Sequence, residues 1–189
     1  MELLMTPTSP FARKVRVFAR ERGLVLTETP VSPLEDDSRL LEAHPLGRVP
    51  CLLDGLRSIV DSRVIVQHLG QGEDGRRTLE DRVLEAEADG IMDAGVAIVM
   101  ERRRPVQTRS EDWIERQTLK IVRSLQTRPI FSVETPISVG ALAFGCALGY
   151  IDFRLPEVLW REQRGELADL FSRLAQRPSF VETMPPADR

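Results

Sequence analysis

Cysteine is scarce in this chain of 189 residues, which contains only Cys51 and Cys146. Two cysteines without C-x-x-C spacing exclude a disulfide framework and a cysteine-rich metal site, and they favour a reducing compartment. The two histidines, His44 and His68, have no cysteine or acid at ligand spacing. We therefore expect no metal.

Long apolar runs are also missing. The longest apolar-looking run, from Val139 to Ile151, is too short to cross a bilayer. The first residues lack a basic segment followed by an apolar stretch, so we expect no signal peptide. Asparagine is absent, which excludes N-glycosylation sequons. A cytoplasmic protein without a membrane partner is expected.

Neither sign of charge is in large excess. The formal net charge is −3, so we expect no general attraction to nucleic acid. Hydrophobic residues make up 42% and charged residues 29% of the chain, as is ordinary for a globular protein. Of the 26 basic residues only Lys14 and Lys120 are lysines, which we attribute to overall composition.

The first part of the chain alternates short strand-like and helix-like segments. Ser9 followed by Pro10 is typical of a helix start, and Gly23 is typical of the residue after a helix end. Between them, apolar positions recur at helical spacing, with basic residues expected on the opposite side: Arg13, Lys14, Arg16 and Arg20. Strands are predicted at 2–5, 24–29, 50–53 and 57–59, and further helices at 38–43 and 61–69. The predicted order is βαβαββα.

The glycine-rich, acidic segment from Gly70 to Gly75 marks the predicted domain boundary. It separates an α/β domain (1–72) from an all-helical domain (78–189). In the second domain, helices are predicted at 79–104, 111–126, 138–149 and 159–176, with a short piece from Pro178. The helix at 138–149 is small and apolar all round, so it should be buried.

Four sequence blocks carry a resemblance to a known family. They are Thr8-Ser9-Pro10-Phe11-Ala12-Arg13-Lys14-Val15-Arg16, His44-Pro45-Leu46-Gly47-Arg48-Val49-Pro50, Asp61-Ser62-Arg63-Val64-Ile65 and the segment from Gly145 to Arg154. In this order the chain resembles bacterial, serine-type glutathione S-transferases. The resemblance implies a thioredoxin-like first domain, an all-helical second domain, and glutathione as co-substrate without a metal.

The first block implies the catalytic residue, Ser9, with Thr8, Pro10 and Phe11 beside it in the glutathione site. A helix N-terminus favours anions and lowers the pKa of a thiol placed there. A serine hydroxyl at that point can donate a hydrogen bond to the glutathione thiolate. The alternative is that Ser9 is only a helix cap.

The other two blocks of the first domain imply further contacts with glutathione. Val49, before a cis Pro50, would pair through its backbone with the cysteinyl part, and Arg48 could meet the glycyl carboxylate. Asp61 and Ser62 would hold the γ-glutamyl end, with Asp61 near its ammonium or holding the turn. The alternatives are a trans proline at an edge strand, an exposed arginine without a role, and a plain Asp cap followed by a serine.

The second domain is expected to supply an apolar electrophile pocket, chiefly from residues 91–100, where Met92 and Met100 either line the pocket or pack in the core. The sequence departs from the family at Ala141, where an acid usually completes a capping box with Ser138. The only tyrosine is Tyr150, so tyrosine-type catalysis is excluded.

Three functions are compatible with such a chain. The first is a glutathione transferase acting in detoxification on a small electrophile. The second is a glutathione-binding or regulatory protein of the same fold. The third, a thioredoxin-like reductase, is disfavoured because a serine stands where its nucleophilic cysteine should be. The resemblance and the long helix from Leu79 to Arg104 predict a homodimer.

Overall fold

The computed structural model describes residues 1–71 and 77–187 of the chain. It divides into two compact units, one comprising Met1–Thr78 with Pro178–Arg189 and the other Leu79–Arg177. The sequence pattern predicts a single domain over 78–189, whereas the structure groups the segment from Pro178 with the first unit. Most of the predicted boundary segment, Gly72 to Gly75, lies outside the described residues.

The first unit is built on a mixed four-stranded sheet in the order β2-β1-β3-β4. Strand β1 (Glu2–Met5) pairs in parallel with β2 (Thr27–Pro30) and antiparallel with β3 (Cys51–Asp54). Strand β4 (Arg57–Ile59) completes an antiparallel hairpin with β3. The turn contains Gly55 at φ 59°, a conformation that glycine adopts without strain. The predicted hairpin is confirmed, and β2 begins three residues later than predicted.

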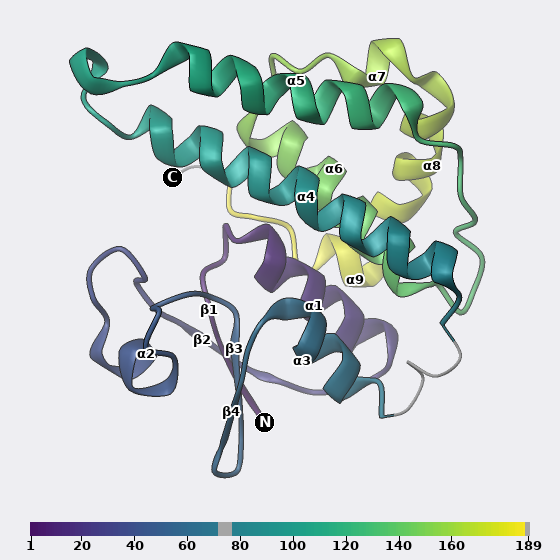
Figure 1. The fold of residues 1–189 in the computed structure, drawn as a ribbon. Coiled ribbons are helices and arrows are strands. Elements are labelled where there is room, and N and C mark those ends of the chain that lie inside the picture. Colours follow the sequence, from purple (N-terminus) through teal and green to yellow (C-terminus); the bar gives the residue numbers. More distant parts are fainter. Residues whose placement is uncertain (72–76, 188–189) are drawn as a thin grey trace. The chain divides into compact units, whose positions relative to one another are not determined.

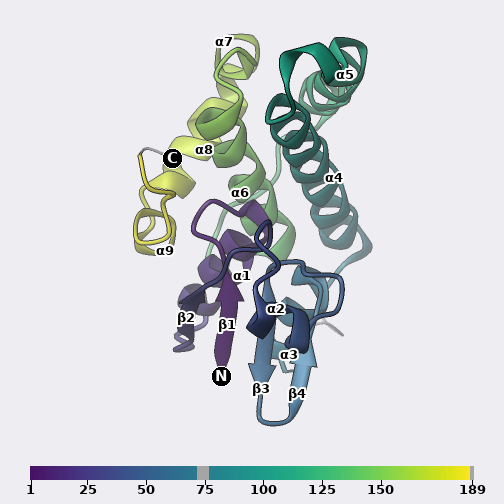
Figure 2. The same cartoon turned by 90° about the vertical axis from the view of Figure 1, so that its left-hand side faces the viewer.

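Helices cover both faces of this sheet (Figures 1 and 2). Helices α1 (Pro10–Glu21) and α3 (Ser62–Leu69) pack together, and α3 also contacts β3. The short helix α2 (Ser38–Ala43) contacts β3 through a separate apolar cluster that contains Leu4, Val31, Leu40 and Cys51. Because neighbouring strand residues point to opposite faces, each buried strand contributes to both layers.

Helix α1 begins and ends as its sequence predicts, but its basic residues are not on a solvated face. Ser9 caps it, and Gly23 follows it at φ 65°. Arg13 and Arg16 are buried and Lys14 is fully buried. The correction has a physical cause: the chain returns after the helical unit and covers this side of α1 with residues 178–183.

The second unit is helical throughout its described residues. Its longest helices are α4 (Leu79–Arg102), α5 (Glu111–Thr127) and α6 (Val139–Arg154), with a short 3-10 turn, η2 (Val106–Thr108), before α5. Helix α4 packs against both α5 and α6. Helix α6 is buried from Val139 to Ile151, so the predicted apolar helix is the core of this unit, and it extends five residues further than predicted.

The predicted helix at 159–176 is divided in the structure. Helix α7 (Trp160–Gln163) and helix α8 (Gly165–Ala175) are separated at Arg164, whose backbone leaves the helical region. The Arg164 guanidinium donates hydrogen bonds to the carbonyl oxygens of Leu125, Gln126 and Arg128 at the end of α5. This tertiary contact gives the last carbonyls of α5 their partners. A last short helix, α9 (Pro178–Val181), packs on α1 within the first unit.

The N-terminus of α6 takes a carboxylate from another helix. Ser138 caps it by accepting a hydrogen bond from Ala141 N–H at 3.2 Å, and Asp81 of α4 accepts one from Gly140 N–H at 2.7 Å. An acid from α4 thus accepts one amide at this helix start, whereas the acid of a capping box would accept the Ser138 N–H. In the parts of the chain that the structure describes, no helix is both long and apolar enough to cross a membrane.

Candidate active site

The strand register brings the predicted site segments to one end of the sheet. Leu4 of β1 pairs with Cys51 of β3, so the loop to Ser9 leaves β1 beside the residue where β3 begins. Leu52 of β3 pairs with Ile59, so β4 ends on the same side, two residues before Asp61. In sheet order, the segments containing Ser9, Pro50 and Asp61 therefore follow the neighbouring strands β1, β3 and β4.

Ser9 lies half-buried at the N-terminus of α1. Its Oγ accepts a hydrogen bond from Ala12 N–H at 3.2 Å, and its own N–H donates to Thr6 O at 3.1 Å. Among the described residues, no acceptor takes the hydroxyl hydrogen of Ser9. The cap and a donor role are therefore compatible, since the cap uses only an oxygen lone pair.

The neighbours of Ser9 form the first turn of α1. Pro10 is the buried first helical residue, while Thr8 and Phe11 are half-buried. Phe11 N–H, one of the free amides of this turn, donates to no described residue. A free amide and a free hydroxyl thus occur together at the positive end of the helix dipole, which is an arrangement that favours an anion.

The segment before β3 turns sharply at Gly47, which has φ 61°, and then enters the cis Val49–Pro50 peptide bond. Pro50 is buried and Val49 is half-buried. Arg48 is exposed and has no ion-pair or hydrogen-bond partner among the described residues. The structure thus leaves Arg48 accessible to solvent, one residue before Val49.

Asp61 and Ser62 begin α3. Asp61 Oδ1 accepts hydrogen bonds from Arg63 N–H at 2.9 Å and from Val64 N–H at 3.3 Å, so Asp61 caps the helix. Ser62 is the first helical residue and is buried, and its hydroxyl bonds to no described residue. Of the two roles considered for Asp61, its contacts match the one that holds the turn.

A cysteine also lies at this end of the sheet. Cys51, which follows Pro50, is fully buried, and burial raises the pKa of its thiol, so it is a poor nucleophile. Within residues 1–71 and 77–187, no group of three or more His, Cys, Asp or Glu side chains could hold a metal ion.

The two methionines considered for an electrophile pocket differ in exposure. Met92 is fully buried and packs in the core, whereas Met100 is 38% exposed.

Helix α1 is held by contacts that its sequence pattern does not reveal. Arg13 donates to Phe180 O at 3.1 Å, and Arg16 to Thr183 O at 3.4 Å. Arg16 and Arg20 each lie 2.8 Å from a different carboxylate oxygen of Glu28 on β2. Burial lowers the pKa of Arg16, and the neighbouring Glu28 opposes that shift. Helical spacing placed these arginines on one face but did not show that the chain returns to cover it.

Comparison with known proteins identifies the family. Residues 3–77 match the glutathione S-transferase N-terminal domain. An Escherichia coli protein described as the uncharacterized GST-like protein YibF is 34% identical, over 98% of this chain and 99% of its own length. The chain therefore belongs to the glutathione S-transferase family.

Solved structures agree with this assignment. A glutathione S-transferase from Methylobacterium radiotolerans, in complex with glutathione sulfonate, matches with a TM-score of 0.88 and 33% identity, over 100% of this chain and 96% of that one. One from Methylobacillus flagellatus with glutathione bound matches with a TM-score of 0.87 and 35% identity, over 98% and 99%. The thioredoxin-like first domain followed by helices is confirmed.

Proposed function

We propose that this protein is a glutathione transferase that binds glutathione across the ends of β1, β3 and β4 and activates its thiol with Ser9. The observation that carries the proposal is the free hydroxyl hydrogen of Ser9 at the N-terminus of α1, at the sheet end that the other predicted site segments share. The glutathione complexes of the two bacterial relatives support glutathione as the ligand.

The size of the sheet end suits a tripeptide. Neighbouring strands lie about 4.8 Å apart, so β1 and β4 are separated by about 10 Å. An extended chain of three residues also spans about 10 Å. The cysteinyl part would lie between Ser9 and Val49, pairing with the Val49 backbone as an added strand does. The γ-glutamyl carboxylate would reach the hydroxyl and the backbone N–H of Ser62, with the exposed Arg48 available to the glycyl carboxylate.

Ser9 would act by stabilising the negative charge on the sulfur of the glutathione thiolate. A hydrogen bond to a charged group contributes about 1.5–3 kcal/mol, which corresponds to about one to two units in the thiol pKa. Ser9 does not have to remove a proton, because favouring the thiolate is enough. The thiolate then attacks the electrophilic atom of a small second substrate.

We also propose that the active molecule is a homodimer.

Two measurements on the purified protein test this function together. Calorimetric titration should show glutathione binding, and a panel of electrophiles should include at least one that is conjugated in the presence of glutathione. The Ser9→Ala variant should bind glutathione nearly as well and conjugate it more slowly at neutral pH. Binding without conjugation of any electrophile would favour the glutathione-binding or regulatory protein, and absence of binding would refute both.

A further inference from the structure

Arg13 ties the first turn of α1, which begins after Ser9, to the C-terminal segment of the chain. The three residues between Ser9 and Arg13 have no polar side-chain atom, so Arg13 is the first that can hydrogen bond through its side chain to another segment. Its backbone N–H donates to Ser9 O at 3.0 Å, and its guanidinium donates to Phe180 O at 3.1 Å. The guanidinium also lies over the Phe180 ring, 5.6 Å from the ring centre. One residue therefore links Ser9 to Phe180.

The segment 178–183 is itself held in place, so it can support this contact. Thr183 is fully buried, and its hydroxyl donates at 2.7 Å to a carbonyl oxygen of the preceding turn. Helix α9, within the segment, packs on α1 (Figure 1). In the last turn of α1, Arg20 lies 3.1 Å from the Glu182 carboxylate. The segment thus contacts α1 along its length, and Arg13 makes the contact nearest to Ser9 along the helix.

Stability alone does not account for an arginine at position 13. The residue is 6% exposed, and no carboxylate of the described residues pairs with it. Its Nε–H is also buried without a hydrogen-bond partner in the part of the chain that the structure describes. An unpaired buried charge and an unsatisfied donor both cost free energy. An unbranched apolar side chain would fill the same space without either cost.

The position of the Ser9 hydroxyl depends on the turn that Arg13 holds. Ser9 Oγ accepts a hydrogen bond from Ala12 N–H at 3.2 Å, and Ser9 O accepts the one from Arg13 N–H. The first amides of a helix have no backbone partner within it, so this turn is more easily distorted than the helix interior. A hydrogen bond weakens steeply when its donor and acceptor are misaligned. A small rotation of the turn would therefore weaken a contact between Ser9 and a thiolate without unfolding the helix.

We propose that Arg13 is a positioning residue for the transferase reaction, which orients the Ser9 hydroxyl toward the glutathione thiolate by holding the first turn of α1 against Phe180. The inference rests on the proposed function of Ser9. Arg13 acts through Ser9 and touches no reacting atom. The C-terminal segment thereby takes part in the chemistry, because it provides the fixed point to which Arg13 binds.

The test is a double-mutant cycle, read by ultraviolet titration of the bound glutathione thiolate in the full-length protein. Arg13→Met should raise the pKa of the bound thiol by about 0.5–1 unit, because misalignment weakens the Ser9 contact without abolishing it. In the Ser9→Ala background the same substitution should cause no further shift, because the hydroxyl that Arg13 positions is absent. A merely structural role for Arg13 would lower stability and leave both titrations unchanged.

Two further variants complete the experiment. Arg20→Gln is the matched control, because Arg20 also contacts the C-terminal segment but lies in the last turn of α1, and the titration midpoint should not change. Phe180→Leu removes the ring beneath the guanidinium and keeps an apolar side chain and the backbone carbonyl. It should shift the midpoint in the same direction as Arg13→Met by a smaller amount, and it replaces that variant if Arg13→Met does not fold.

The outcomes separate this proposal from the proposed function. An unchanged midpoint in Arg13→Met would show that Arg13 serves stability alone. Equal shifts with and without the Ser9 hydroxyl would show that the charge of Arg13 acts on the thiolate directly. Either result overturns the proposal and leaves Ser9 as the donor. If Ser9→Ala alone does not move the midpoint, the proposed role of Ser9 is wrong, and the role of Arg13 falls with it.

Discussion

At the scale of single residues, the hydroxyl of Ser9 has two hydrogen-bonding capacities, and the fold uses one. Its oxygen accepts the Ala12 amide, and its hydrogen remains available. Ser138 makes the same contact with Ala141 at the start of α6, also at 3.2 Å, but in the helical unit, away from the candidate site segments. Substitution of each serine by alanine therefore removes the same capping contact, but only at Ser9 does it also remove the proposed donor to the glutathione thiolate.

Replacing Ser9 by alanine should raise the pKa of the bound glutathione thiol by about one to two units, because a hydrogen bond worth about 1.5–3 kcal/mol to the thiolate is lost. The pH dependence of kcat should move to higher pH by the same amount. Ultraviolet titration of the glutathione complex measures the thiolate directly. Ser138→Ala should cost about 0.5–2 kcal/mol of stability and leave that titration unchanged. Equal titration midpoints for wild type and Ser9→Ala would show that Ser9 is only a helix cap.

Ser62 should control glutathione affinity rather than turnover, since it is placed to bind a part of the substrate that does not react. Ser62→Ala is therefore expected to raise KM for glutathione with little change in kcat. Asp61→Ala should in addition lower stability by about 0.5–2 kcal/mol, because Asp61 caps α3. Steady-state kinetics and urea unfolding distinguish the two, and a fall in kcat alone for Ser62→Ala would contradict the assignment.

At the scale of elements, α4 and α6 approach closely where Gly140 lies. A Cβ built on Gly140 would lie 2.5 Å from the backbone oxygen of Asp81 and 2.9 Å from Leu84 Cβ. The missing side chain at Gly140 therefore allows both the close approach of the two helices and the hydrogen bond to Asp81. The carboxylate reaches the start of α6 because no side chain separates the helices there.

Gly140→Ala should destabilise the protein by about 1–3 kcal/mol, the usual cost of overpacking. Gly90→Ala, on the exposed side of α4 with no atom within 4 Å of the new methyl group, should instead stabilise it by about 1 kcal/mol through helix propensity. Urea unfolding of both variants provides the measurement. A neutral Gly140→Ala would show that the helices separate at little cost.

The helix α1 depends on residues far away in the chain. Arg13 and Arg16 both bind carbonyl oxygens of residues 178–183, and the Arg20 guanidinium lies 3.1 Å from the Glu182 carboxylate. Arg16→Ala should destabilise the fold by about 1–3 kcal/mol, because a buried carbonyl contact and part of the Glu28 pairing are lost. Arg20→Ala, in a more exposed setting, should cost less than about 1 kcal/mol. Equal losses in urea unfolding would contradict this ranking.

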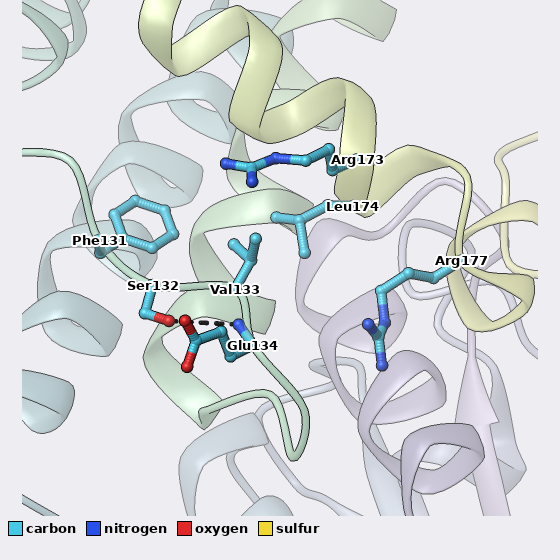
Figure 3. A pocket seen from close by; sticks show the side chains of 7 residues that line it. All are labelled: Phe131, Ser132, Val133, Glu134, Arg173, Leu174 and Arg177. Carbon is cyan, nitrogen blue, oxygen red and sulfur yellow. Dashed lines mark hydrogen bonds between the residues drawn. The ribbon is translucent and has the colours of Figure 1, made fainter.

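Local chemistry explains which elements were predictable. The start and end of α1 follow from Ser9-Pro10 and Gly23, and the β3–β4 hairpin from Asp54-Gly55, because these signals act within a few residues. The break at Arg164 and the burial of Arg13 depend on contacts with α5 and with residues 178–183. Such long-range contacts leave no local pattern. The candidate site segments could be proposed from the family resemblance, whereas the pocket lined by residues 131–134 and by Arg173, Leu174 and Arg177 (Figure 3) could not, since its two walls lie about forty residues apart in the chain.

At the scale of the whole molecule, we expect two copies to associate. Helices α4 and α5 carry exposed large apolar side chains, among them Leu79 (71%), Val83 (49%) and Leu119 (49%). Burying apolar area of this kind between identical subunits is the usual basis of a two-fold dimer. Sedimentation at micromolar concentration should give twice the chain mass of 21.3 kDa. A species at the single-chain mass would contradict the homodimer.

The return of residues 178–183 to α1 affects how the protein is made. The first unit cannot bury Phe180 and Thr183, both almost inaccessible in the folded protein, until the ribosome has released them. Residues 79–177 are translated in between, which at about 5–20 residues per second takes on the order of ten seconds. During that interval the nascent α/β unit exposes the side of α1 that these residues cover. The helical unit is continuous in sequence, so no part of it has to wait in this way for a distant segment.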